Sequence, residues 1–153
     1  MHFGILSDDD ALVRVLSGAA DRLAVEVTAA RPSDVEALRR HPLDAVILDE
    51  ERLSPAVGTR LHELRRALGR VHTFLLLEHE PYPAPDVPSD PGARDHDTKR
   101  AQDLGVCLVQ RKPFHPSEFL RLVIRTIAQE EAGLRDCAVA SHSDLAGPRA
   151  DGG

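Results

Sequence analysis

Aromatic residues and cysteines are scarce in this sequence of 153 residues. It contains no tryptophan, one tyrosine and two cysteines, Cys107 and Cys137. Two cysteines are too few for a disulfide framework, so we expect a reducing compartment, the cytoplasm. The core must be built from Leu, Val, Ile and Ala, and Cys107, which lies inside an apolar run, is expected to be a small core residue.

An excess of positive charge and long hydrophobic runs are also missing. The formal net charge of −6 argues against a protein that binds duplex nucleic acid, which normally has a basic face. No apolar run approaches the length that spans a membrane, and no basic segment followed by an apolar stretch follows Met1. We therefore expect an acidic domain without a secretory signal that binds neither nucleic acid nor membrane.

Short apolar runs are the strongest structural signal in the chain. They lie at 3–6, 23–27, 45–48, 74–77 and 106–109 and are predicted to be strands. Between them, apolar residues recur at helical spacing, as in Val57, Leu61, Leu64 and Leu68. Alternating strands and helices predict an α/β fold, with a doubly wound five-stranded parallel sheet of order 2-1-3-4-5 and helices on both faces.

Residues at helix ends give further local predictions. Asp10 is predicted to cap the first helix, and Ser33 with Glu36 predicts a capping box that opens the second helix. The fourth helix has few apolar residues besides Ala101 and Leu104, so we expect it to be short and loosely held.

We expect a single domain over residues 1–136. Two segments lie outside the regular pattern of strands and helices. Residues 78–92 contain five prolines, which exclude a helix or central strand and predict a loop insertion. Residues 137–153 are mostly small and polar, and they predict a disordered tail. No repeat, second domain or output module is visible.

Acidic residues follow the strands that meet where the strand order reverses. Residues 7–10 (Ser-Asp-Asp-Asp) follow the first strand, residues 49–51 (Asp-Glu-Glu) the third, and residues 111–113 (Arg-Lys-Pro) the fifth. Ligands of doubly wound sheets bind at this edge. Clustered carboxylates repel one another unless a cation joins them, and Mg²⁺ suits oxygen ligands and phosphate. Carboxylates, Mg²⁺ and a lysine together predict phosphoryl transfer to an aspartate.

Each residue of this cluster also has a simpler interpretation. An aspartate at a strand end is often only a helix cap, but Asp49 closes a four-residue apolar run. Lys112 is one of two lysines, the other being Lys99 on a polar helix. Their joint placement at three strand ends favours the functional interpretation. Three histidines match no compact metal motif and are expected to be solvated: His79, His96 and His115.

Several segments resemble the receiver domain of response regulators, the CheY-like family. They are residues 5–14 (ILSDDDALVR), 45–49 (AVILD), 104–105 (LG) and 112–114 (KPF), in the order and spacing of that family over residues 1–132. The resemblance implies a flavodoxin/CheY-like fold and a stand-alone, atypical receiver in two-component phosphorelay signal transduction. It implies no enzyme activity beyond self-catalysed phosphorylation and dephosphorylation of the domain's own aspartate.

The resemblance also implies roles for individual residues. Asp49 would accept the phosphoryl group and contribute to Mg²⁺ binding. Asp9 would bind Mg²⁺ directly with the help of Asp8, and the backbone carbonyl of Glu51 would be a further ligand. Lys112 would bind the phosphoryl oxygens, and the peptide bond between Lys112 and Pro113 would be cis.

The sequence departs from the family pattern in its switching residues. Glu78 stands where receivers carry Thr or Ser, and Val109 stands where they carry an aromatic residue. Pro55 and Gly58 lie later than the family pattern places them. We therefore expect the phosphoryl chemistry to be retained and expect no switch built on a Thr/aromatic pair.

The resemblance implies protein partners. A histidine kinase or phosphotransfer protein would supply the phosphoryl group, and a downstream protein target would receive the signal. By analogy with the family, the fourth helix, the fifth strand and the last helix, which begins at Pro116, would be the surface of a homodimer.

Two alternatives stay open. In the first, the domain is a phosphorylation-independent interaction module in which Glu50, Glu51 and Glu78 supply fixed negative charge. In the second, it is a small phosphatase of the haloacid-dehalogenase type, because Asp8-x-Asp10 resembles the opening motif of that family. The hydroxyl and the late acidic pair that this family needs are not evident.

Overall fold

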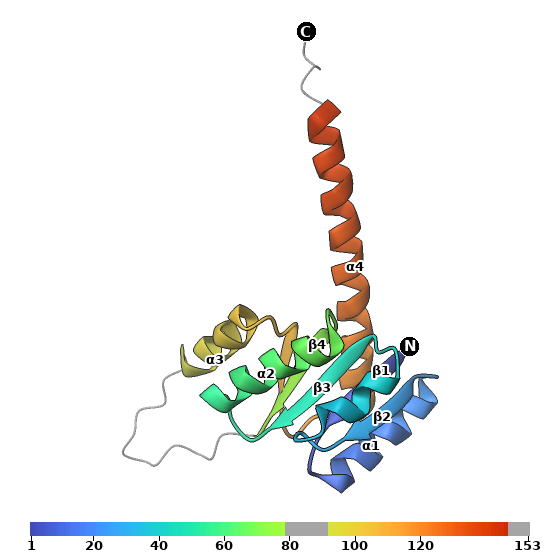
Figure 1. Cartoon of the computed structure of the whole chain (residues 1–153), viewed down its shortest axis with the longest axis vertical. Helices are drawn as coiled ribbons and strands as arrows, with labels where there is room; N and C mark the ends of the chain where they lie inside the picture. Colours follow the sequence, from blue (N-terminus) through green and yellow to red (C-terminus); the bar gives the residue numbers. More distant parts are fainter. Residues whose placement is uncertain (79–91, 147–153) are drawn as a thin grey trace.

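The computed structural model describes the backbone of residues 1–78 and 92–146 and the side chains of residues 1–78 and 98–133. The strands, all parallel, have the order β2-β1-β3-β4-β5, which confirms the predicted doubly wound sheet (Figure 1). The strands are β1 (His2–Leu6), β2 (Glu26–Ala30), β3 (Ala45–Glu50), β4 (His72–Leu77) and β5 (Leu108–Arg111). The helices are α1 (Asp10–Arg22), the 3₁₀ helix η1 (Val35–Arg40), α2 (Pro55–Leu68), α3 (Gly92–Asp103) and α4 (Pro116–Ala146).

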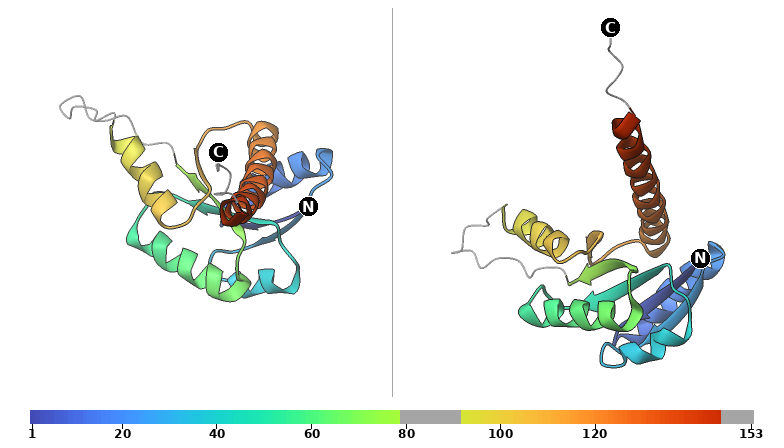
Figure 2. Two further views of the ribbon diagram at one scale, coloured as in Figure 1. Left: turned by 90° about the horizontal axis from the view of Figure 1, so that it is seen from above. Right: turned by 45° about the horizontal axis from the view of Figure 1, so that its top comes forward.

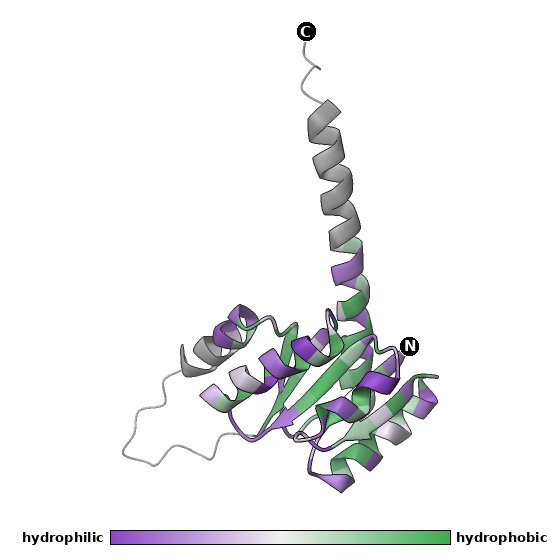
Figure 3. Ribbon diagram, viewed as in Figure 1, coloured by the Kyte–Doolittle hydropathy of each residue, from purple (hydrophilic) through white to green (hydrophobic). Residues whose placement is uncertain are grey.

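The helices cover both faces of the sheet (Figure 2). Successive side chains of a strand point to opposite faces, so Ile47 packs with α1 and α4, whereas Val46 and Leu48 pack with η1 and α2. The apolar residues concentrate in the central strands, and the polar ones lie on the outer faces of the helices (Figure 3). Burial on both faces explains why these strands are continuous apolar runs rather than alternating ones.

Two strands begin later than the apolar runs predict. β2 begins at Glu26 because the backbone N–H groups of Leu23, Ala24 and Val25 bind carbonyls of the last turn of α1. β5 begins at Leu108, since the N–H of Val106 binds the carbonyl of Ala101 in α3. The apolar residues at 23–25 and 106 therefore end helices instead of starting strands.

The predicted caps of the first two helices are wrong by one residue. Asp9, not Asp10, caps α1, and its Oδ1 accepts hydrogen bonds from the N–H groups of Ala11 and Leu12. The second helix is the short 3₁₀ helix η1, whose N-cap residue is Asp34. Ser33 and Glu36 therefore form no capping box.

The fourth helix, α3, has 12 residues and is not shorter than an average helix, contrary to the prediction. Ala101 anchors it in the core that β3 and α2 share.

The last helix extends further than the sequence predicts. α4 has 31 residues and ends at Ala146, so residues 137–146 are helical and not the tail that we expected. Residues 134–146 contain neither proline nor glycine, so nothing in them ends the helix. Beyond the sheet, α4 projects away from the rest of the fold (Figure 1). The remaining tail, 147–153, and the predicted loop at 79–91 lie outside the described residues.

None of the helices in the described part of the chain combines the length and apolar character that crossing a bilayer requires.

Two glycines provide a matched test of the packing. A Cβ atom at Gly4 in β1 would lie 2.9 Å from Leu43 Cδ1 and 3.1 Å from Leu38 Cδ1, whereas one at Gly18 in α1 would meet nothing within 4 Å. We expect Gly4→Ala to lower the free energy of unfolding by about 1–3 kcal/mol through overpacking. Gly18→Ala should raise it by about 0.5–1 kcal/mol because alanine favours the helix. Urea denaturation measures both, and a Gly4→Ala variant as stable as the native protein would contradict this packing.

Candidate functional site

The acidic residues at the carboxyl ends of β1 and β3 lie together around an open cavity. Its volume is about 680 Å³. Its lining consists of Asp8, Asp9, Pro32, Asp49, Glu50, Glu51, Arg60, Glu78 and Lys112. Each residue for which the sequence predicted a metal or phosphoryl role is among them. The sheet register explains this, since the parallel pairing of β1, β3 and β4 brings their carboxyl ends to one edge.

Asp49 is held by two side chains from other strand ends. Its Oδ1 lies 2.7 Å from Nζ of Lys112, and its Oδ2 accepts a hydrogen bond of 2.6 Å from the hydroxyl of Ser7. The side chain of Asp49 is 10% exposed, so these partners stabilise a carboxylate that water contacts only in part. This fixes the orientation of the carboxylate towards the cavity.

Ser7 is a site residue that the sequence analysis did not identify. It follows β1 directly and is almost fully buried. Besides donating to Asp49, its Oγ accepts a hydrogen bond of 3.0 Å from the N–H of Asp9. A polar residue between an apolar strand and the acidic run was the only signal for it.

Lys112 contacts two carboxylates. Its Nζ lies 2.7 Å from Asp49 and 2.8 Å from Oε1 of Glu78. Burial lowers the pKa of Lys112, but the hydrogen bonds and charges of Asp49 and Glu78 outweigh it, so that the pKa is raised overall. Lys112 is therefore a full positive charge at neutral pH. The bond between Lys112 and Pro113 is cis, as the resemblance implied.

Glu78 turns into the cavity and not outwards. Its carboxylate donates no proton at neutral pH and instead accepts a hydrogen bond from Lys112. Its N–H donates to the carbonyl of Glu51, with an N–O distance of 3.1 Å. The residue that replaces the expected Thr or Ser is thus a second anionic partner of the lysine.

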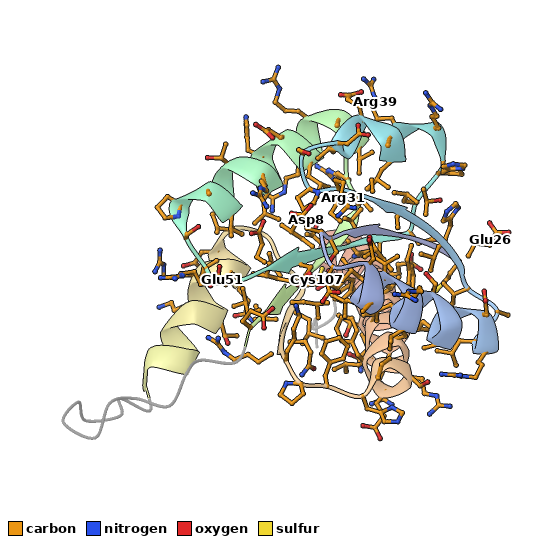
Figure 4. All side chains as sticks on the ribbon, turned by 90° about the horizontal axis from the view of Figure 1, so that it is seen from below. Asp8, Glu26, Arg31, Arg39, Glu51 and Cys107 are labelled. Atoms are coloured by element: carbon orange, nitrogen blue, oxygen red, sulfur yellow. The ribbon has the colours of Figure 1, made fainter. Side chains whose placement is uncertain are left out.

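Two arginines offset part of the negative charge around the cavity. The sequence analysis identified neither of them as a site residue. Arg31, which follows β2, donates to the backbone carbonyl of Asp8 at 2.9 Å and lies 3.7 Å from its Oδ1 (Figure 4). Arg60 of α2 pairs with Glu50. Burial raises the pKa of Glu50, Arg60 opposes this increase, and the charges of Asp49 and Asp8 add to it, so the pKa is raised overall.

The donor set of the cavity fits a hard divalent cation. The lining residues carry six carboxylates against the two cations Arg60 and Lys112, which leaves an excess of four negative charges. Oxygen ligands and excess negative charge are what hard cations such as Mg²⁺ require. Asp9 uses Oδ1 to cap α1, and its second carboxylate oxygen would be the one that reaches a metal ion. The Glu51 carbonyl, which accepts one hydrogen bond, has a second lone pair.

Ser7→Ala tests whether Ser7 supports this arrangement. The change removes the hydrogen bond to Asp49 Oδ2 and leaves the N–H of Asp9 without its acceptor. We expect a loss of about 1–2 kcal/mol in the free energy of unfolding. Ser54→Ala is the matched control, because Ser54 makes no side-chain capping bond at the start of α2. Equal denaturation midpoints for the two variants would contradict the assigned role of Ser7.

Solved structures share this fold. A response-regulator receiver domain from Clostridium thermocellum has 14% identity and a TM-score of 0.61, with 86% of this chain and 97% of that chain covered. The chemotaxis protein CheY4 of Vibrio cholerae has 15% identity and a TM-score of 0.61, with 82% and 97% covered. Full-length FixJ from B. japonicum has 19% identity and a TM-score of 0.66, with 94% of this chain and 66% of FixJ covered.

No family model matches the chain, and no curated protein matches its sequence. The structural likeness, the strand order and the position of the acidic cavity agree. The chain therefore has the fold of the response-regulator receiver domains.

Proposed function

We propose that the protein is a receiver domain of a two-component phosphorelay that accepts a phosphoryl group on Asp49 with the help of Mg²⁺. The observation that carries this proposal is the 2.7 Å contact between Asp49 and Lys112 inside a cavity rich in carboxylates. The donor would be a histidine kinase or phosphotransfer protein in the cytoplasm. The signal would leave through protein contacts, with the surface of α3, β5 and α4 as the candidate interface, including that of a homodimer.

The residues of the cavity suit the chemistry of an aspartyl phosphate. One carboxylate oxygen of Asp49 bonds to phosphorus while the bond from phosphorus to the donor breaks, and the donor keeps that electron pair and takes up a proton. Ser7 holds the carboxylate in place, and Lys112 supplies positive charge beside the incoming oxygens. Asp8, Asp9, Asp49 and the Glu51 carbonyl would hold Mg²⁺, which when bound neutralises charge on the phosphoryl group. The domain would catalyse only this transfer to its own aspartate and the hydrolysis of the resulting aspartyl phosphate, which releases inorganic phosphate and restores the carboxylate.

A second candidate function follows from Glu78. Its carboxylate accepts a hydrogen bond from Lys112, the group that would bind the phosphoryl oxygens. An interaction module that works without phosphorylation could use Glu78 as a permanent anion on Lys112. The two functions share the fold and differ in whether Asp49 reacts.

Intact-protein mass spectrometry after incubation with Mg²⁺ and acetyl phosphate tests the proposal. We expect a single phosphoryl adduct that disappears with EDTA and in Asp49→Asn. Asp10→Asn is the matched control and should keep the adduct, because Asp10 lies next to the cavity but does not line it. Folded native protein that gains no adduct would exclude the phosphoacceptor function and favour the interaction module.

Replacement of Glu78 tests how far it opposes phosphorylation. Glu78→Thr and Glu78→Gln both remove an anion from Lys112, and both should speed the reaction with acetyl phosphate. A half-exposed ion pair is worth at most about 1 kcal/mol, so the increase should reach at most about fivefold. The rate is measured from the adduct fraction over time.

Glu51→Gln is the control for the general loss of negative charge. Glu51 lines the same cavity, but its carboxylate lies 3.9 Å from Arg52 and is exposed. An equal increase in Glu51→Gln would attribute the effect to overall charge and contradict a specific role of Glu78. Unchanged rates in both Glu78 variants would remove that residue from the phosphorylation step.

A further inference from the structure

A second group of ligand-type side chains lies at the amino end of the sheet, away from the acidic cavity. His72 is the first residue of β4, Cys107 immediately precedes β5, and Glu130 lies in α4. The potential ligand atoms of these three residues all lie within 4.8 Å of one another. The chain brings them together from three elements that are far apart in sequence.

The individual distances are short. Sγ of Cys107 lies 3.8 Å from Nδ1 of His72, and the same nitrogen lies 3.9 Å from Oε2 of Glu130. Cys107 was expected to be a small core residue. It does pack against the core, but it is only partly buried and its sulfur lies close to the imidazole of His72. A role in packing alone does not require an imidazole and a carboxylate beside the thiol.

Regular secondary structure fixes the positions of these residues. The N–H of Cys107 donates to the carbonyl of Thr73 with an N–O distance of 2.8 Å, which ties the residue before β5 to β4. α4 packs on the same face through Val123 and Ile127, the latter one turn before Glu130. Sites built on strands and helices hold their geometry better than sites on loops.

The donor set and its dimensions suit a divalent transition metal. Thiolate, imidazole and carboxylate are the ligands of zinc, and hard cations such as Mg²⁺ avoid sulfur. Around a tetrahedral Zn²⁺ ion, with bonds of about 2.0–2.3 Å, neighbouring ligand atoms lie about 3.4–3.6 Å apart. The two separations from Nδ1 of His72, 3.8 and 3.9 Å, exceed these values by a few tenths of an ångström. The third pair, Cys107 and Glu130, lies within 4.8 Å, so Glu130, whose side chain is half-exposed, would move towards the sulfur when the metal binds.

The site is also accessible to an ion from solution. The side chain of His72 is 22% exposed and that of Glu130 is 48% exposed. Three protein ligands leave the fourth tetrahedral position for water or for a group of another molecule.

We propose that His72, Cys107 and Glu130 form a binding site for a Zn²⁺-type divalent metal ion, separate from the acidic cavity. On binding, the thiol of Cys107 loses its proton to solvent and the thiolate, imidazole and carboxylate bond to the metal. The ion ties α4 to β4 and to the start of β5, at the place where the helix leaves the sheet. A metal ion that binds the folded chain therefore stabilises the docking of α4.

Metal titration of the full chain, without a histidine tag and after removal of metal by EDTA and dialysis, tests the proposal. Calorimetry in excess Mg²⁺, which fills any site of hard oxygen ligands, should show one equivalent of Zn²⁺. Co²⁺ should produce the near-ultraviolet charge-transfer absorption of a cobalt–thiolate bond. The same absorption should be absent in Cys107→Ser.

Further variants separate this site from incidental metal binding. His72→Asn and Glu130→Gln should each weaken Zn²⁺ binding by at least about tenfold. Loss of a group that only hydrogen-bonds to a metal ligand already lowers the affinity by about this factor. Cys137→Ser is the matched control and should keep the absorption and the affinity. Glu130 is half-exposed, so Glu130→Gln tests the site even if a variant at Cys107 fails to fold.

The proposal is overturned if folded native protein binds no Zn²⁺ in excess Mg²⁺, or if Glu130→Gln and Cys107→Ser bind it as tightly as native protein. Loss of the cobalt–thiolate absorption in Cys137→Ser but not in Cys107→Ser would also overturn it. None of these results bears on the phosphorylation of Asp49, which intact-protein mass spectrometry tests separately.

Discussion

The contact between Lys112 and Asp49 is the interaction on which the candidate site depends. It joins the residue after β5 to a residue near the end of β3 across the end of β4, so it requires the strand order β3-β4-β5. It also supplies the counter-charge to a carboxylate that is 10% exposed. Removing Lys112 would leave the carboxylate of Asp49 with the neutral hydroxyl of Ser7 in place of a counter-charge. Glu78 changes the balance, because the same ammonium group binds a second carboxylate and is already paired before any phosphoryl group arrives.

The two ends of the sheet carry different chemistry. The carboxyl end gathers carboxylates around a lysine and suits hard cations and phosphoryl oxygens. The amino end brings a thiol, an imidazole and a carboxylate together and suits a softer metal. α4 connects the two ends, since it begins shortly after Lys112 and passes the amino end at Glu130 before it projects beyond the sheet (Figure 2). The same helix therefore starts next to the acidic cavity and carries a ligand of the proposed metal site.

The sequence predicts the sheet and the cavity well because both follow from apolar periodicity and from the rule that places ligands at strand ends. Asp8, Asp9, Asp49, Glu51 and Lys112 line the cavity, as their places at the strand ends predict, and Glu78 lines it too. Contacts across the sheet are harder to predict: Ser7 and Arg31 meet the site only through packing that a linear pattern does not encode. The predicted helix starts were wrong for a local reason. Adjacent polar residues such as Asp9 and Asp10 can both cap a helix, and the sequence alone does not show which of them does.

Lysine-selective NMR can show whether Lys112 is shared between Asp49 and Glu78 in solution. The sequence has two lysines, so a sample labelled at the lysine side chains gives one signal for Lys112 and one for Lys99. We expect the Lys112 signal to titrate above the ordinary pKa of lysine and to shift in Glu78→Gln. It should shift again when Mg²⁺ and beryllofluoride, a phosphoryl mimic, are added. At constant pH, the Lys99 signal should change neither on the Glu78 substitution nor on addition of the mimic. A Lys112 signal that changes neither on substitution of Glu78 nor on addition of the phosphoryl mimic would show that Lys112 is not the group that Asp49, Glu78 and the phosphoryl oxygens share.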